Sequence, residues 1–264
     1  MENTRSVAAP AAQPMPVVRA IAWSDVRQAL VAGIEDFRAA PVFGLFFGAV
    51  FAAGGILILA CLFRLGLAYL AYPLAAGFVL VGPFAAAGLY EVSRRRERGL
   101  PLDWPGVLAA PLRQGRRELG WMAFVCLFIL LMWMYQVRLL LALFLGFSLP
   151  PTLGGFFAAV FGTPEGVAFL AVGHLVGAAM ALLTFALTVV SFPLLLDRDR
   201  DFITAMITSV QAVVQNPGPM LAWAGLVTAL LVVAMLPLFL GLVVVLPVLG
   251  HATWHLYRRL IAPA

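Results

Sequence analysis

The chain has 264 residues, of which 63% are hydrophobic and only 11% are charged, and its mean hydropathy is +1.02. A water-soluble domain usually has about 25% charged residues and under half apolar ones, so this composition excludes a soluble globular fold and requires a lipid bilayer as solvent. The net charge of +5 rests on arginine alone, because the chain has no lysine. These arginines lie beside the hydrophobic stretches, where anionic lipid headgroups are the expected partner and nucleic acid is not.

Residues 1–22 open with an alanine- and proline-rich stretch, and we expect them to form a disordered cytoplasmic segment. They lack the apolar core of about 7–15 residues that marks a cleavable signal peptide. The first hydrophobic span is therefore expected to act as the insertion signal. Cys61 lies late in that span and Cys126 early in the third, which predicts two packing thiols at different depths and no disulfide.

Six apolar stretches are long enough to cross about 30 Å of hydrocarbon as helices. They are Val42–Phe63, Leu65–Tyr90, Trp121–Phe147, Val167–Leu196, Pro219–Leu236 and Leu238–Tyr257. Because the last two are separated by almost no turn, a shallow re-entrant pair is the alternative there. All arginines except Arg64 and Arg138 fall in segments on one side of these spans, which predicts that both termini are cytoplasmic.

The chain also contains an internal repeat. The apolar stripe of residues 23–37 aligns with residues 199–213, and Pro41 aligns with Pro217. Further along, the arginine pair Arg94–Arg95 aligns with Arg258–Arg259. Each copy is typical of an interfacial helix, a proline break and a hydrophobic hairpin.

Three interfacial helices are expected. Residues 24–40 form the first, with Ser24 as N-cap, and residues 201–215 form the last, capped by Asp199 or Asp201. Asp103–Leu119 is a degenerate middle copy. The predicted fold is therefore all-α: a six-span polytopic membrane bundle of three tandem units, each an interfacial helix plus a transmembrane hairpin, around a pseudo-threefold axis. The units are residues 23–98, 99–198 and 199–261.

Two histidines are the first candidate site. His251 and His255 stand at positions i and i+4 of the last helix, which is the spacing of two metal or haem-edge ligands on one face. No third ligand is evident nearby, and the aligned residues of the first copy are Ala87 and Glu91. Hydrogen bonding at the headgroup interface is the alternative. We expect no cofactor, with haem or a metal ion at this pair as the competing hypothesis.

Other candidate residues are single positions. His174 lies within the fourth span, and an ionisable group there favours a transport or relay role, with helix packing as the alternative. Arginines at the ends of the hairpins are predicted to contact lipid headgroups. These arginines are Arg94, Arg95, Arg258 and Arg259.

Catalytic signatures are missing from the sequence. It contains no GxxxxGK[ST], no HExxH and no GxSxG motif, so nucleotide-driven pumping, zinc proteolysis and serine hydrolysis lack their usual residues. We therefore expect that the protein is not an enzyme.

Several segments together resemble a proteobacterial family catalogued as predicted integral membrane proteins, domain of unknown function 2189. The likeness is carried by Phe192–Asp197, Asp201–Phe202, Asn216–Met220 and, most specifically, Leu246–Arg259, and it extends from Trp23 to Ile261. The resemblance implies a multi-pass protein of the bacterial inner membrane and brings no established activity. Some members carry haem-oxidase-like labels, but this chain lacks the several intramembrane histidines that such an enzyme needs.

Three functions are compatible with these observations. The leading hypothesis is a non-enzymatic scaffold, assembly or envelope-maintenance factor with other membrane proteins as partners. The second is a passive carrier or channel for a small or lipidic solute, for which a site between the repeats would be expected. The third is a haem- or metal-binding membrane protein.

Overall fold

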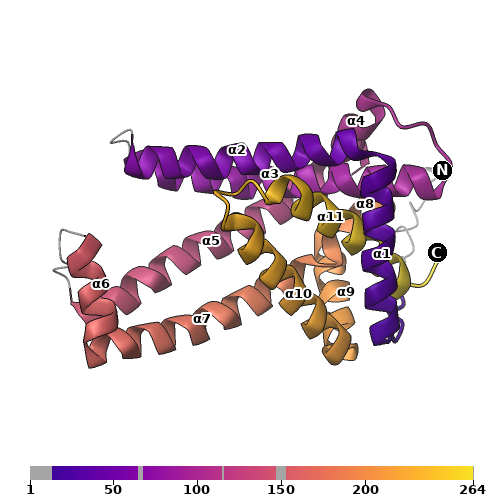
Figure 1. Ribbon diagram of the computed structural model, residues 1–264. Helices are drawn as coiled ribbons and strands as arrows, with labels where there is room; N and C mark the ends of the chain where they lie inside the picture. Colours follow the sequence, from indigo (N-terminus) through magenta and orange to yellow (C-terminus); the bar gives the residue numbers. More distant parts are fainter. Residues whose placement is uncertain (1–13, 65–67, 115, 147–152, 264) are drawn as a thin grey trace, which may run out of the picture.

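The computed structural model describes residues 14–64, 68–114, 116–146 and 153–263, and within them it leaves aside the side chains of 68–81, 83, 111–114 and 116–117. These ranges form eleven helices, and their one β-bridge joins Val18 to Ile261. Figure 1 shows long helices running in roughly one direction, with α1 and α9 lying across them at one end. We call this the terminal end, because the first and last described segments pair there. The all-α prediction is confirmed.

The repeat predicted from proline positions is visible in the backbone. Helix α1 (Trp23–Ala39) is followed by α2 (Pro41–Phe63), and α9 (Phe202–Gln215) is followed by α10 (Pro217–Met235). The single residue at each break has nearly the same conformation, with φ −136° and ψ 55° at Ala40 and φ −127° and ψ 52° at Asn216. A proline then starts the next helix, where its missing N–H removes no helical hydrogen bond.

The remaining helices fill the middle of the chain. They are α3 (Ala68–Glu97), α4 (Trp104–Gln114), α5 (Arg116–Leu145), α6 (Leu153–Gly162), α7 (Pro164–Thr188), α8 (Ser191–Asp197) and α11 (Leu242–Leu260). The predicted middle helix Asp103–Leu119 is too long, because α4 ends at Gln114 and the residues from Arg116 onward belong to α5. The predicted fourth span is interrupted at Val189–Val190, after which α8 begins. The connection between α5 and α7 contains the short helix α6; residues 147–152 lie outside the described ranges.

Two of the capping predictions have different outcomes. Ser24 is not the N-cap of α1, since the helix begins at Trp23 and the Asp25 carboxylate accepts a hydrogen bond from the Ala22 backbone N–H at 2.8 Å. Asp25 takes the capping role because a carboxylate near the helix start accepts hydrogen bonds from the free N–H groups and is stabilised by the helix dipole. The Asp201 cap is confirmed by a 2.8 Å bond from the Thr204 N–H to its carboxylate.

The predicted disorder of residues 1–22 is wrong for the part that the structure describes. Backbone hydrogen bonds join Arg19 to Leu260 at 2.7 Å and Ala262 to Val17 at 3.0 Å. The Asn216 side chain accepts from the Ile21 N–H at 2.8 Å and donates to the Arg19 carbonyl at 3.1 Å. The strand-like segment thus ties the chain start to both the last helix and the second proline break.

Four helical stretches in the described part of the chain are long and apolar enough to cross a membrane. They are Pro41–Phe63, Glu118–Leu145, Pro164–Asp197 and Pro217–Met235. Most of their surface is open in the single chain; only 6% of the most apolar window in Glu118–Leu145 is buried, as expected where lipid is the solvent. The predicted span Leu65–Tyr90 falls largely on side chains outside the description, and α11 is not among the four stretches.

The last hairpin is shorter than the first. The turn between α10 and α11 brings Phe239 against Gly55 of α2, where an added Cβ would lie 2.7 Å from the ring. Eight residues of α2 follow Gly55, which adds about 12 Å of helix beyond the turn. Figure 1 shows the same relation, with the α10–α11 turn beside α2 well before its end.

The tightly packed core lies at the terminal end. Trp223, Trp254 and Tyr257 are fully buried there together with much of α8. Helix α1 packs on α11 so closely that a Cβ on Gly33 would lie 2.5 Å from the Ala252 nitrogen. The core therefore fixes α11 between α1 and α3, and this placement positions the groups described next.

Candidate functional site

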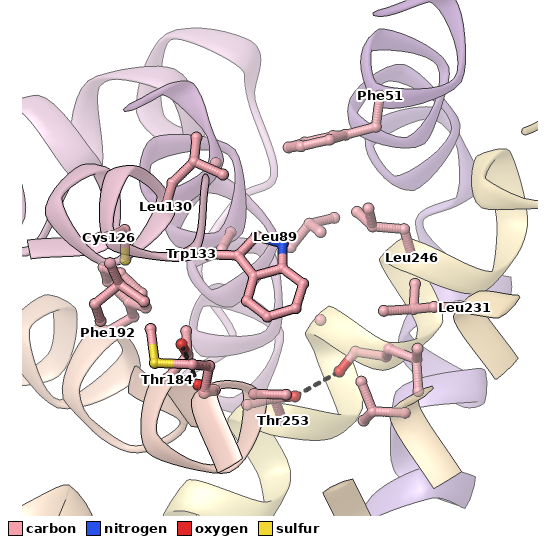
Figure 2. Close-up of a pocket in the computed structure, with 18 of the residues that line it drawn as sticks. Phe51, Leu89, Cys126, Leu130, Trp133, Thr184, Phe192, Leu231, Leu246 and Thr253 are labelled. Carbon is pink, nitrogen blue, oxygen red and sulfur yellow. Dashed lines mark hydrogen bonds between the residues drawn. The ribbon is translucent and has the colours of Figure 1, made fainter. Parts of the chain in front are cut away.

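A cavity of about 620 Å³ lies between the helices of the bundle and is open to the outside over much of its surface; its volume is within the range of roughly 300–1,000 Å³ that is usual for small-molecule sites. Six helices contribute most of its lining: α2, α3, α5, α7, α10 and α11. Figure 2 shows the Trp133 ring near the middle of this space, with Leu130, Cys126 and Phe192 on one side and Phe51, Leu246 and Leu231 on the other.

The lining is almost wholly apolar. None of the described residues around the cavity is charged, and its two threonine hydroxyls donate to backbone carbonyls of their own helices. These bonds run from Thr184 to Met180 at 2.8 Å and from Thr253 to Leu249 at 2.7 Å. Such a surface suits an apolar molecule and offers an ion no compensation for its lost hydration.

An ion-pair layer closes the cavity toward the terminal end. In α3 the lining residues Leu89 and Tyr90 are followed directly by Glu91, and in α11 the lining residue Thr253 is followed by Trp254 and His255. The layer joins α1, α3, α8 and α11. Its members are Asp25, Asp36, Glu91, Arg94, Arg95, Arg96, Glu97, Arg98, Asp197, Arg258 and Arg259.

The four arginines predicted to contact lipid all belong to this layer. Arg94 and Arg95 donate to Glu91 at 2.6 and 2.8 Å, while Arg258 bonds Glu97 at 3.0 Å and Arg259 lies 3.2 Å from Asp25. Arg94 is buried, whereas the side chains of Arg258 and Arg259 are each 34% exposed. The structure thus gives each arginine a carboxylate partner, and headgroup contact stays a prediction.

Helix α11 is joined to the layer by two further hydrogen bonds. The Trp254 indole N–H donates to Glu97 at 3.1 Å, and the Tyr257 hydroxyl donates to Asp197 at 2.8 Å. Asp197 also accepts from Arg98 at 2.9 Å. Aromatic residues of the buried core are therefore fixed in orientation by the same carboxylates that hold the arginines.

His251 and His255 share a helix but have separate partners. His251 is fully buried, and its Nδ1 lies 2.8 Å from the Ser93 hydroxyl of α3. The His255 Nε2 bonds Asp36 of α1 at 2.8 Å. No group of three or more histidine, cysteine or carboxylate side chains in the described ranges is arranged to hold a metal ion. The metal or haem assignment remains a prediction from spacing.

Asp36 connects these two histidines with α3. It accepts hydrogen bonds from Arg96 and His255. Burial alone would raise its pKa, but hydrogen bonds from His255 and Ser93 and the charge of His255 hold that pKa below the ordinary value of 3.8. Asp36 is therefore an ionised carboxylate in the interior of the α1–α3–α11 contact.

Burial lowers the pKa of His251, whereas burial alone would raise the pKa of Asp36. Loss of solvation lowers its pKa from 6.5 to about 4; the Asp36 carboxylate opposes this shift, while the positive charges of His255 and Arg96 add to it. His251 is thus neutral at physiological pH, and its Nε2 has no hydrogen-bond partner in the described part of the chain.

Acidification is expected to destabilise the protein through His251. Between pH 6.5 and about 4 the unfolded chain binds a proton at His251 that the folded chain does not, so stability falls as the pH falls. From pH 7.5 to 5 the loss should be about 2 kcal/mol in the free energy of unfolding. Unfolding temperatures measured in detergent across this range should fall steeply for the wild type and much less for His251→Gln.

The matched control is His174→Gln. His174 is exposed on α7, and its Nδ1 lies 2.7 Å from the Leu170 carbonyl of the same helix. This variant should keep the wild-type dependence on pH. If His251→Gln retained the full acid sensitivity, burial of His251 would not be its cause. The structure places His174 away from the described cavity lining and the ion-pair layer.

Sequence reasoning identified the basic residues and missed their partners. Asp36, Ser93 and Asp197 carry no motif, and only their burial at helix contacts marks them. The cavity was also missed, because its lining comes from apolar residues that resemble all others in the spans. A usable signal was the acidic residue on the apolar face of the first amphipathic helix: Asp36 stands on the face of α1 that contains Val26, Ala29 and Gly33.

Comparison with known proteins gives one match. A family model described as predicted integral membrane protein (DUF2189) covers residues 70–197, from α3 through α8. It includes Phe192–Asp197, whereas the C-terminal segment Leu246–Arg259 lies beyond the matched stretch. No curated protein and no solved structure matches the chain.

The apolar spans and the family match agree with each other. Over residues 70–197 the chain is similar to the DUF2189 family of predicted integral membrane proteins, a description that assigns no function, and its long apolar helices agree with a membrane protein.

Proposed function

We propose that the protein is a non-enzymatic membrane protein that binds an apolar, lipidic solute in the open apolar cavity between its helices, as a carrier or storage site. The observation that supports this proposal is the cavity of about 620 Å³ with no charged residue in its described lining. A scaffold needs only a packed bundle, whereas the lining of an open apolar cavity between helices lacks packing contacts within the protein. Occupation by a lipid-like molecule would recover them.

The chemistry of the lining favours a lipidic solute over an ion or a polar metabolite. A pathway for ions needs polar or charged groups that replace water, and here the threonine hydroxyls are engaged by their own helices. Next to the lining residue Tyr90, the buried Glu91 carboxylate is bonded to Arg94 and Arg95, which places ion pairs at the terminal end of the cavity. Entry from the hydrocarbon side fits this arrangement.

The topology that accompanies this proposal places both termini on the cytoplasmic side of the bacterial inner membrane. It is supported by the arginine distribution and by the pairing of Val18 with Ile261. The three tandem units would be related by a pseudo-threefold axis, with α10 and α11 as a re-entrant hairpin in place of a third full crossing pair. The contact of Phe239 with Gly55 supports that shorter hairpin.

Filling the cavity tests the proposal. Gly82 belongs to the lining, and a Cβ there would meet no atom within 4 Å, so Gly82→Leu should occupy ligand space without a backbone clash. Ala181→Leu fills the same space from α7. Gly225→Leu is the control, because Gly225 is equally open, exposed on α10 and outside the described lining.

The measurement is photolabelling in lipid nanodiscs with a long-chain alkyl diazirine, read by mass spectrometry of the labelled peptides. Labelling at Leu249 and Thr253 in the cavity should fall about tenfold in Gly82→Leu and Ala181→Leu, because filling the space costs the probe more than about 1.4 kcal/mol. Labelling at Leu143, which is 69% exposed, should not change. If the cavity residues were never labelled in the wild type, or were labelled equally in all variants, the proposal would be wrong.

A further inference from the structure

Tyr90 is the polar group of the cavity that lacks a partner. It lines the cavity and is only 6% exposed, yet its hydroxyl makes no hydrogen bond to any described residue. Its ring is stacked against Trp254 with 6.5 Å between ring centroids, and this contact with the buried core fixes the position of the Tyr90 ring. Tyrosine hydroxyls in apolar surroundings normally find a hydrogen-bond partner; the Tyr90 hydroxyl is not among the fully buried unpaired atoms, so a molecule in the adjoining space can supply one.

Trp133 adds a second free group to the same lining. Its indole N–H forms no hydrogen bond within the described part of the chain, and Figure 2 shows the ring standing in the cavity. An indole N–H can only donate, whereas a phenol can donate and accept. An oxygen acceptor is therefore the ligand group that can satisfy either side chain.

The surroundings exclude a charged acceptor. The described lining contains no cation to balance a carboxylate or phosphate. The nearest arginines in sequence, Arg94 and Arg95, are both bonded to Glu91. An anion moved into this space would lose its hydration without compensation, and a cation would meet the same cost because Glu91 is already neutralised.

We propose that the cavity selects neutral long-chain molecules bearing a carbonyl oxygen, which accepts a hydrogen bond from Tyr90 or Trp133 while the chain fills the apolar space. This inference rests on the proposed lipidic-solute function and adds the chemical class of the solute. Tyr90 and Trp133 act as binding residues, and no covalent step is involved.

The test compares four competitors of the diazirine label at Leu249 and Thr253 in nanodiscs. They are nonadecane, 2-nonadecanone, stearate and stearylamine, which share a similar chain and differ in the head. In the wild type the ketone should compete at about tenfold lower concentration than the alkane, as expected when a hydrogen bond satisfies a buried donor. The two charged competitors should be weaker than the ketone.

Tyr90→Phe is the decisive variant, because phenylalanine keeps the ring against Trp254 and removes only the hydroxyl. The advantage of the ketone over the alkane should shrink toward one in this variant, and Trp133→Phe should reduce it as well. Tyr135→Phe is the control, since Tyr135 is 68% exposed on α5 and outside the described lining. It should keep the wild-type ratio.

The outcomes separate the two proposals. Cavity labelling without a preference for the ketone, a preference that survives in Tyr90→Phe, or stronger competition by stearate or stearylamine would overturn the inference and leave the apolar site standing. Absence of cavity labelling in the wild type would overturn the site itself.

Discussion

Gly33→Ala is expected to destabilise the protein strongly, by about 3 kcal/mol in the free energy of unfolding, at the upper end of the usual cost of overpacking. The added Cβ would lie 2.5 Å from the Ala252 backbone nitrogen and 2.7 Å from the Ala252 Cβ. No side-chain rotation relieves a contact with backbone, so α1 and α11 must move apart. That movement would also pull Asp36 away from His255.

The measurement is the unfolding temperature in detergent, followed by the helical signal and by the loss of monodisperse protein. Gly225→Ala is the matched control, because a Cβ there meets nothing within 4 Å. In a helix interior this exchange is favourable by up to about 1 kcal/mol, so the control should be unchanged or slightly stabilised. Equal behaviour of the two variants would mean that the α1–α11 contact is not close.

Asp36→Asn is expected to have the second large effect, a loss of about 3 kcal/mol, as found when one partner of a buried ion pair is removed. The Asp36 side chain is 8% exposed and accepts from both Arg96 and His255. Asparagine has the same shape but no charge, so the Arg96 guanidinium loses its counter-ion and the His255 ring loses its carboxylate partner. The α1–α3–α11 contact should open, and the exposure of α1 to protease should rise.

Glu35→Gln is the control for Asp36→Asn. Glu35 precedes Asp36 on the same helix, is exposed to solvent, and forms no salt bridge with the described residues. Removing its charge should change stability by less than about 0.5 kcal/mol. Thermal unfolding and limited proteolysis of the two variants, side by side, check the prediction. A small effect of Asp36→Asn would mean that apolar packing, and not the ion pairs of Asp36, stabilises the α1–α3–α11 contact.

Local sequence features predicted the local structure well. The alignment of Pro41 with Pro217 identified two breaks with nearly identical backbone angles, because a proline at a helix start acts through its own ring and needs no distant partner. Asp201 was predicted as a cap for the same reason. Ser24 failed because a neighbouring carboxylate, Asp25, competes for the same N–H groups.

Predictions about charged residues did not include the partners that the fold supplies. Arg258 and Arg259 were assigned to lipid headgroups because they follow an apolar stretch, yet Glu97 and Asp25 lie beside them in the fold. Likewise, the spacing of His251 and His255 was compatible with a shared metal or haem and with separate hydrogen bonds, and the fold places Ser93 and Asp36 beside them; metal or haem binding stays a prediction. A pattern along one helix cannot show which face of another helix it will meet.

The sequence by itself determined that this is an all-α membrane protein with a repeated helix–proline–helix unit. Both properties follow from composition and from short-range geometry, which need no knowledge of the fold. Only the tertiary structure decided that the arginines form an ion-pair layer, that the last hairpin ends beside Gly55, and that an apolar cavity remains between the helices. These features depend on contacts between side chains that are distant in sequence. The same types of apolar residue occur at helix contacts and at the cavity wall, so the sequence does not distinguish the two.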